Sequence, residues 1–337
     1  MDISLMKKLA NMDQIAGIRE VELKTGKSQG VRVFEFYNAA GFAFSVTPDL
    51  CMDLYDLRFK GTNLAYHSKN GIISPFAFSP VNGVFVDQWI GGAMKTCGLD
   101  NVGGQCEKGG VFPTHGRIGF TPAQHFGTAA FWDGDRYVMR ASGDIHFTKA
   151  FGTHVSIRRT IETDLFATSL TIHDVITNHQ PDPEPVMMLY HTNFGYPLVD
   201  EGSCVYTAPS TYETKAPDSN DYQHLVAPID GKEEELYLHS GFGKMSCAAI
   251  VNENLGLAAY VKADTANLPN ILEWKHERSH DYVLALEPCN TCCLNRADAI
   301  REEKMAYLPG YGTIENTIEI GALAGKEEIA SFLDGLK

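Results

Sequence analysis

The 337-residue sequence has few cysteines, no long apolar run and a shortage of positive charge. Its eight cysteines are far below the density of small secreted proteins that disulfides hold together, so we expect reduced thiols. No window approaches the ~18 apolar residues of a membrane-spanning helix, and residues 1–14 lack the apolar middle of a secretory signal. We therefore expect a cytoplasmic protein.

Basic residues are outnumbered, with 28 Lys and Arg against 42 Asp and Glu, which gives a net charge of −14. This charge repels phosphate backbones and anionic lipid headgroups, so nucleic acid and membrane surfaces are poor candidate partners. The 44% hydrophobic and 21% charged residues are typical of a globular chain that can bury a sizeable core. At roughly 150 residues per domain the length allows about two domains, or one large β domain.

Most of the chain has the two-residue periodicity of β-strands. Tyr55, Leu57 and Phe59 share one phase of such a run, and Arg159 interrupts the apolar phase of another, at 153–163. The other strands that we predict cover residues 31–37, 42–47, 136–147, 168–178, 186–191, 244–251, 255–262, 282–287 and 313–320. Because amphipathic helices do not alternate with these strands, the pattern favours an all-β fold of antiparallel sheets packed face to face.

Helical signals are confined to the ends of the chain. We predict a short helix at residues 4–11, capped by Ser4, and another at 325–336. Residues 82–124 are rich in glycine with little periodicity, which is typical of a functional or disordered segment. The polar residues 207–235 indicate a surface insertion.

Three polar clusters lie in apolar or glycine-rich surroundings: His115 with Arg117, His191 with Asn193, and Glu287. A carboxylate at the end of an apolar strand is partly desolvated, which suits a general base, and a histidine can supply the complementary acid. The same residues are compatible with a plain strand end at Glu287 and a hydrogen-bonded core imidazole at His191. Spacing along the chain does not decide between the two.

Metal and nucleotide sites have little support. Cys289, Cys292 and Cys293 contain one CxxC, but the second half of a zinc site is missing, and distant ligands such as Cys97, Cys106 or His125 would be needed. The paired glycines of residues 91–104 fit neither a dinucleotide fingerprint nor a P-loop. We therefore expect no metal and no cofactor.

The order of these motifs resembles the aldose 1-epimerase (galactose mutarotase) superfamily. His115-Gly lies in a glycine-rich loop, His191 and Asn193 follow an apolar strand, and Leu-Glu287-Pro comes near the C-terminus. Residues 96–101 (TCGLDN) make the chain similar to a divergent bacterial branch of uncharacterised substrate. The resemblance covers residues 31–320, and its motifs are specific only in combination.

The resemblance implies one galactose mutarotase-like domain over residues 1–337, a β-supersandwich with a lead-in at 1–30 and a C-terminal helix at 325–337. It implies catalysis by Glu287 as the base and His191 as the acid, with His115 in contact with the sugar. The Asn-Arg pair that galactose mutarotases place ahead of the first histidine motif has no clear counterpart. The aspartate that commonly holds a sugar hydroxyl also has none.

Further substrate-binding candidates are Arg117, Asn193, Trp274 and Lys275. Arg117 is the candidate replacement for the missing guanidinium, and Trp274 and Lys275 precede the Glu287 strand. An indole face packs on the C–H face of a pyranose and a lysine can donate to hydroxyls, although a core Trp beside a solvated Lys fits equally well.

The resulting prediction is an isomerase that interconverts the α and β anomers of an aldose or modified sugar by acid–base ring opening. The alternatives are a hexose-phosphate 1-epimerase, which needs a cationic rim, and a non-catalytic carbohydrate-binding protein. A glycosidase would need a second carboxylate facing Glu287, and the motifs offer histidines instead. We expect a small-molecule sugar as the partner and a monomer or homodimer as the assembly.

Overall fold

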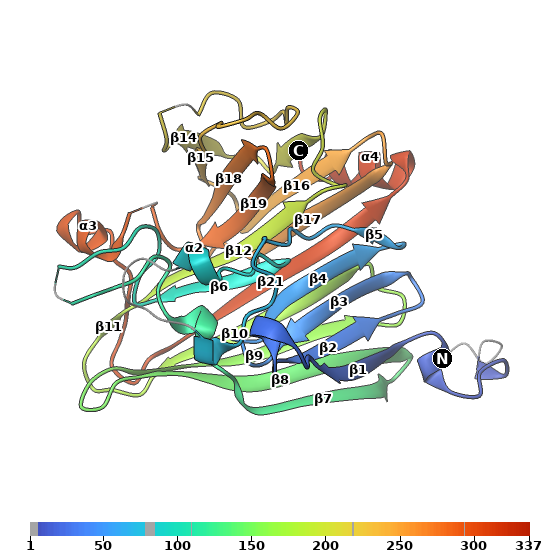
Figure 1. Ribbon diagram of the computed structural model, residues 1–337, viewed down its shortest axis with the longest axis horizontal. Helices are drawn as coiled ribbons and strands as arrows, with labels where there is room; N and C mark the ends of the chain where they lie inside the picture. The colour runs from blue at the N-terminus through green and yellow to red at the C-terminus, as the bar shows by residue number, and fades with distance from the viewer. Residues whose placement is uncertain (1–5, 78–84, 109, 218, 293) are drawn as a thin grey trace.

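The computed structural model describes residues 6–77, 85–108, 110–217, 219–292 and 294–337, which form two large antiparallel β-sheets and a small one (Figure 1). The eleven-stranded sheet has the following strands in spatial order: β1 (Gly17–Glu22), β2 (Arg32–Tyr37), β3 (Phe42–Thr47), β4 (Asp53–Phe59), β6 (Met94–Leu99), β12 (Met187–Gly195), β19 (Asp281–Cys289), β18 (Asn270–Arg278), β15 (Glu235–Ser240) and β14 (Thr211–Thr214), with β5 (Thr62–Asn63) paired to β4.

The eight-stranded sheet packs against the first one. Its strands in spatial order are β13 (Cys204–Thr207), β16 (Met245–Asn252), β17 (Leu257–Asp264), β21 (Thr313–Ala324), β10 (Ser169–Asn178), β9 (His154–Asp164), β8 (Arg136–Thr148) and β7 (Gln124–Asp133). A third sheet pairs β11 (Glu184–Pro185) with β20 (Tyr307–Leu308). The predicted all-β fold of antiparallel sheets packed face to face is confirmed.

Helices are short. The described ones are η1 (Met12–Gln14), η2 (Gly26–Ser28), η3 (Pro75–Ala77), α2 (Phe85–Gln88), η4 (Ile118–Phe120), α3 (Arg296–Arg301) and α4 (Lys326–Asp334). The predicted C-terminal helix corresponds to α4. The predicted first helix at 4–11 is wrong over residues 7–11, which form turns and irregular backbone, and Ser4, its predicted cap, lies outside the described residues. None of the described helices is long and apolar enough to cross a membrane.

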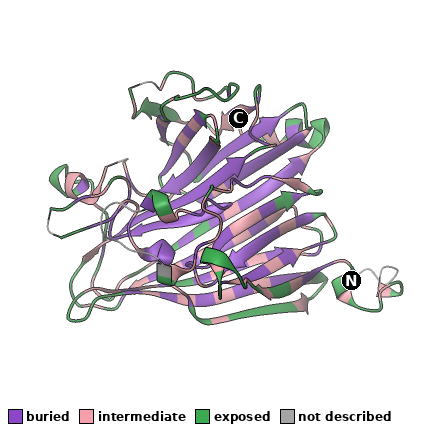
Figure 2. Cartoon of the chain, in the orientation of Figure 1, coloured by how far each residue is buried: buried purple, intermediate pink, exposed green. Residues whose placement is uncertain are grey.

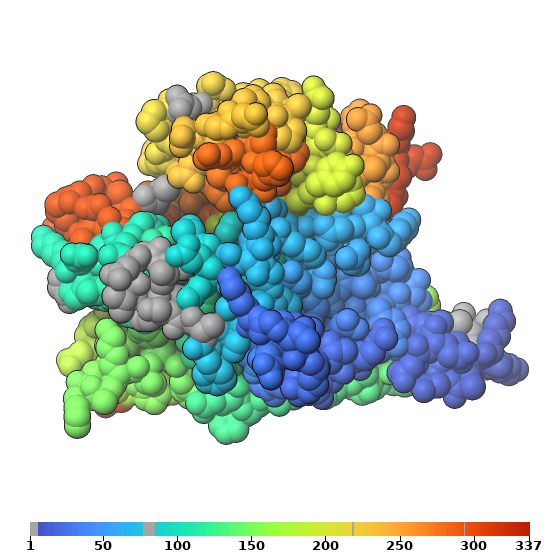
Figure 3. All heavy atoms as spheres, viewed as in Figure 1, coloured from blue at the N-terminus to red at the C-terminus, as the bar shows by residue number. Residues whose placement is uncertain are grey.

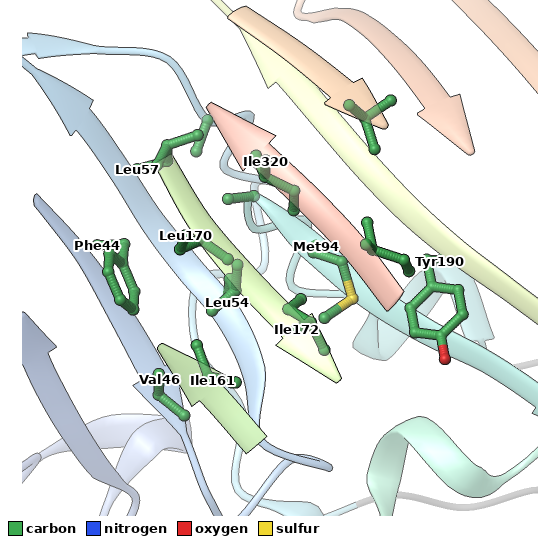
Figure 4. Packing of buried hydrophobic residues seen from close by; sticks show 14 of the residues in the cluster. Phe44, Val46, Leu54, Leu57, Met94, Ile161, Leu170, Ile172, Tyr190 and Ile320 are labelled. Atoms are coloured by element: carbon green, nitrogen blue, oxygen red, sulfur yellow. The ribbon is translucent and has the colours of Figure 1, made fainter. Parts of the chain in front are cut away.

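The strands in the middle of the sheets are buried along most of their length, whereas the edge strand β7 is largely exposed (Figure 2). Apolar side chains of the two sheets meet in the space between them (Figure 4). The first sheet contributes Phe44, Val46, Leu54, Leu57, Met94 and Tyr190, and the second contributes Ile161, Leu170, Ile172 and Ile320. Alternate residues of each strand form this core, which is the packing that the periodicity predicts.

The strands β1, β7, β13, β15 and β18 were not predicted. Two further strands lie in segments that were expected to be irregular or a surface insertion. The glycine-rich segment at 82–124, expected to be irregular, contains β6, and the polar insertion at 207–235 contains the exposed edge strand β14. All six residues of β6 are buried, so neither face of the strand is exposed to solvent, and polar and apolar residues do not alternate along it. β14 lacks the pattern for the opposite reason, since all four of its residues are exposed.

Arg159, which interrupts an apolar phase of the sequence, is fully buried between the sheets. Its Nε and Nη2 atoms donate to the two carboxylate oxygens of Asp174 at 2.8 and 2.7 Å, and Nη1 donates to Thr96 Oγ1 at 2.8 Å. Asp53, 3.4 Å from Arg159, also accepts from Lys95 Nζ at 2.9 Å. Two cations and two carboxylates thus pair inside the core, where an unpaired charge would be very costly.

Replacing Arg159 by Met should lower the free energy of unfolding by ~3–5 kcal/mol, because Asp174 would lose its partner in a buried site. Urea denaturation measures the change. The matched control is Arg158→Gln on the same strand, because Arg158 is 48% exposed and pairs with Asp144 at the surface. The control should cost less than ~1 kcal/mol. Equal losses for the two variants would contradict the buried-pair account.

Candidate active site

His191 and Glu287 face each other across the neighbouring strands β12 and β19. The antiparallel register, which pairs Leu189 with Cys289, puts His191 directly opposite Glu287. Nδ1 of His191 lies 3.0 Å from Oε1 of Glu287, and their side chains are only 6% and 2% exposed. The structure therefore brings together the two residues for which the sequence predicts the acid and base roles.

This pair lies on the face of the eleven-stranded sheet that points away from the eight-stranded sheet. Tyr190 packs in the core between the sheets, and successive residues of a strand point to opposite faces, so His191 projects outward. On the same outer face Leu189, Leu272 and Cys289 form a separate apolar cluster. Loops cover this face and enclose the pair.

Aromatic rings surround the imidazole of His191. The indoles of Trp89 and Trp274 have their centroids 5.4 and 5.6 Å from it and lie 5.7 Å from each other. The ring of His115 lies 5.6 Å away, with Phe85 packed behind it at 5.0 Å. The apolar surroundings strengthen electrostatic interactions within the pair, because little water is left to screen them.

Four buried polar atoms at this place lack a hydrogen-bond partner: Nδ1 of His191, Oε1 of Glu287, Oδ1 of Asn193 and Nε1 of Trp89. The His191 and Glu287 atoms are close, but they are not aligned as a hydrogen bond. Buried polar atoms are nearly always satisfied in folded proteins, so a cluster of unsatisfied ones needs an explanation. Donors and acceptors left free in one spot are suited to a polar ligand rich in hydroxyl groups.

His115 enters the site from a tightly held loop. Its backbone has a positive φ of 57°, its N–H donates to Gly103 O, and its carbonyl accepts from Gly98 N–H, both at 3.0 Å. Gly116 follows with φ 71°, and a Cβ atom there would lie 2.1 Å from Gly98 O. Only glycine fits this turn, which explains the His-Gly pair of the sequence.

The pKa of His115 is lowered to about 3, first by burial and second by its proximity to His191. Burial disfavours the charged imidazolium, and a second positive charge beside His191 would add repulsion. His115 is therefore neutral near pH 7. A neutral imidazole can donate one hydrogen bond and accept another, which suits contact with a hydroxyl group.

Asn101 fixes the loop that carries His115. Its fully buried side chain donates from Nδ2 to the carbonyl oxygens of Pro113 at 2.8 Å and Gly104 at 3.0 Å. Its Oδ1 accepts from the backbone N–H of Arg296 at 2.9 Å. One amide thus connects the His115 loop to the start of α3.

Asn193 and Arg117, two predicted substrate contacts, occupy different positions. Asn193 shares the outer face with His191 and donates from Nδ2 to Gly92 O at 2.9 Å, which leaves its Oδ1 free. The guanidinium of Arg117 forms an ion pair with Asp100 and donates to Val111 O, and its side chain is 28% exposed. Arg117 therefore stabilises the loop beside the pair.

Lys275 does not join the other predicted site residues. It follows Trp274 in β18, so the two side chains point to opposite faces of the sheet. Its Nζ donates to the carbonyl oxygens of Asp221 and His224 at 2.6 and 2.8 Å and lies 3.8 Å from Glu235. The predicted sugar contact of Lys275 is replaced by a structural role under residues 207–235.

Trp89 and Lys95 are site residues that the sequence analysis missed. Trp89 lies in the glycine-rich segment that was predicted to be functional or disordered, but an isolated aromatic in a loop gives no periodic signal. Lys95 is the neighbour of His191 across β6 and β12, and its Nζ lies 4.4 Å from the ring centroid of Phe120. A lysine in a buried strand is rare and was the available signal.

Within the described part of the chain, no group of three or more His, Cys, Asp or Glu side chains is arranged to hold a metal ion. Sγ of Cys289 lies 3.7 Å from Thr291 O, Cys292 is a free thiol, and Cys293 lies outside the described residues. Cys97, Cys106 and His125, the distant ligands considered for zinc, are not gathered into such a group either. The His191–Glu287 pair itself can transfer protons between a carboxyl group and an imidazole.

Comparisons with solved structures show which proteins share this fold. A Klebsiella pneumoniae protein proposed as an aldose 1-epimerase aligns with 99% of this chain and 89% of its own, with a TM-score of 0.88 and 20% identity. A galactose mutarotase-like protein from Clostridium acetobutylicum aligns with 92% of this chain and 99% of its own (TM-score 0.59, 12% identity). Galactose 1-epimerase from Lactobacillus acidophilus aligns with 92% of this chain and 100% of its own (TM-score 0.59, 13% identity).

At these identities the likeness shows a shared fold, the galactose mutarotase-like β-sandwich. A comparison with curated proteins found no matching sequence. The family described as "Domain of unknown function (DUF4432)" matches residues 28–321, which is most of the chain. The chain therefore belongs to the DUF4432 family.

Proposed function

We propose that the protein is an aldose 1-epimerase-type isomerase, which interconverts the α and β anomers of a free aldose or modified sugar. The observation that carries the proposal is the buried pair of His191 and Glu287, 3.0 Å apart, with unsatisfied polar atoms around it. The fold adds support, since a galactose 1-epimerase shares it. The reaction needs one base, one acid and a water-poor site.

Ring opening moves two protons. Glu287, as the carboxylate, takes the proton of the anomeric hydroxyl, while His191, as the imidazolium, gives a proton to the ring oxygen as the C1–O5 bond breaks. Because Nδ1 of His191 faces Glu287, its Nε2 is the nitrogen left for the sugar. Rotation about C1–C2 presents the other face of the aldehyde, and the two groups return the protons as the ring closes.

The charge state that starts this cycle suits the site. A carboxylate beside an imidazolium has no net charge, so it costs less in a buried place than either ion alone. His115 stays neutral and does not compete for the positive charge. Each positioned proton transfer contributes on the order of 10²- to 10⁴-fold to the rate.

The aromatic side chains bind the sugar body in this proposal. Trp89 and Trp274 offer indole faces for the C–H face of a pyranose, and Nε1 of Trp89 and Oδ1 of Asn193 offer free hydrogen-bonding atoms for its hydroxyls. The centroids of both indoles lie within 5.6 Å of the imidazole of His191. A sugar bound at the pair would therefore lie against these rings.

Replacing Glu287 by Gln should slow anomer exchange by at least ~10²-fold, because the amide cannot take the hydroxyl proton. Gln keeps the size of the side chain, so the melting temperature should stay near that of the wild type. Exchange NMR on a panel of neutral, phosphorylated and acidic aldoses measures the rates and identifies the substrate.

The matched control for this variant is Glu315→Gln on β21, whose carboxylate pairs with His173 at the surface. It should exchange anomers at the wild-type rate. Equal rates for wild type and Glu287→Gln would contradict catalysis. A wild type that binds sugars without accelerating exchange would point to a carbohydrate-binding protein, and acceleration only with phosphosugars to a hexose-phosphate 1-epimerase.

His115→Asn should change how stability depends on pH. The unfolded state takes up a proton at His115 near pH 6.5, whereas the folded state does so only near pH 3. The wild type therefore loses up to ~1.4 kcal/mol of unfolding free energy per pH unit from this residue as the pH falls below 6.5. The variant should lose correspondingly less between pH 6.5 and 5 in urea denaturation.

The control for this experiment is His125→Asn. His125 also has a positive φ, 49° against 57° for His115, so Asn is tolerated equally at both backbone positions. Its side chain is 76% exposed. Identical pH dependence for wild type and His115→Asn would contradict a neutral, buried imidazole at position 115.

A further inference from the structure

A second hollow, of about 190 Å³, lies at one end of the sandwich and is lined by neither His191 nor Glu287. Its walls come from the end of β6, the loop before His115, the connection from β8 to β9, β11 and α3. Figure 1 shows α3 and β11 at this end, and Figure 3 shows atoms of the loop (teal) beside those of α3 (orange).

Two cationic side chains, Lys149 and Arg296, line this hollow. Both lie near the buried ring of Phe112, with Nζ of Lys149 5.6 Å and the guanidinium carbon of Arg296 4.7 Å from its centroid. Neither forms an ion pair with any carboxylate of the described ranges. Nη1 of Arg296 donates to the backbone oxygen of Asp100 at 3.2 Å, and the charge of Lys149 acts on the carboxylate of Asp100. The aromatic ring thus lies beside two cations that form no ion pair of their own.

Two acidic side chains also line the hollow, and their partners decide its net charge. Asp100 also lines the hollow, but it is paired with Arg117. Glu184 is the other carboxylate in the wall and stands within ion-pairing distance of neither Lys149 nor Arg296. The lining itself holds two cations and two carboxylates, and Arg117, the partner of Asp100, adds a third cation. This excess of one positive charge attracts an anion, in a chain whose total charge of −14 would otherwise repel it.

We propose that this hollow binds the carboxylate or phosphate group of a small polar molecule, through Lys149 and Arg296. Guanidinium and ammonium groups are the usual partners of both anions, and an unpaired cation pair loses no existing ion pair when the anion arrives. The proposal concerns a site outside the His191–Glu287 pair and does not depend on the epimerase activity.

The occupant of the hollow adjusts the position of His115. Phe112, which the anion-binding cations flank, lies three residues before His115 in the same loop. Asn101 holds Pro113 of that loop with Nδ2 and the backbone of Arg296 with Oδ1. A change at Arg296 is thus transmitted through one buried amide to the loop of the active site.

Titration calorimetry with inorganic phosphate and with malonate, at constant ionic strength and pH 7.5, tests the binding site. The wild type should bind at least one of the two saturably, and the stronger anion identifies the group that the site takes. Lys149→Gln with Arg296→Gln should weaken binding by at least ~10-fold, because charge-assisted hydrogen bonds are lost. Lys326→Gln on exposed α4 is the matched control and should bind like the wild type.

Glu184→Gln makes the test independent of misfolding, since it should tighten binding several-fold by removing the opposing charge. The imidazole NMR signal of His115, assigned with His115→Asn, should shift on saturation with the bound anion in the wild type. It should not shift in the double variant. Absence of saturable binding, or binding unchanged in the double variant, would overturn the site, and an unmoved His115 signal would overturn the coupling.

Discussion

The three central strands β6, β12 and β19 are covered on both faces, so every polar group on them has to find a partner inside the protein. Between the sheets, Arg159 pairs with Asp174 and Asp53. On the outer face Lys95, the neighbour of His191, pairs with Asp53, but one atom each of His191 and Glu287 lacks a hydrogen-bond partner. These two atoms mark the place of the proposed site.

The sequence predicted strands that alternate and strands that form an apolar run. Residues 313–320 alternate and lie within β21, and the apolar run at 186–191 overlaps β12, which is buried on both faces. β6 was missed because it is buried throughout although Lys95 and Thr96 are polar, so it gives neither signal. The pairing of His191 with Glu287 followed from a family resemblance, because the register of strands distant in sequence cannot be read from residue spacing. Lys275 was predicted to contact the sugar together with Trp274. Consecutive residues of a strand point to opposite faces of the sheet, so the two side chains are separated.

Trp89 and Arg159 show what a one-dimensional pattern leaves out. Trp89 gains its role from loop packing, which has no period, and Arg159 from a partner on the adjacent strand, Asp174. Arg117 is a third case, because its guanidinium forms an ion pair with Asp100. In all three the chemistry of the residue was visible in the sequence, and its neighbours were not.

The turn at Gly116 has a consequence for how this protein can evolve. A side chain there would collide with the backbone of Gly98, and both backbones belong to the framework that sets His115. Substitutions of Gly116 are therefore disfavoured, even though glycine has no side chain that could take part in proton transfer. Descendants that keep the loop path must keep this glycine, while side chains that do not set this path remain free to change around it.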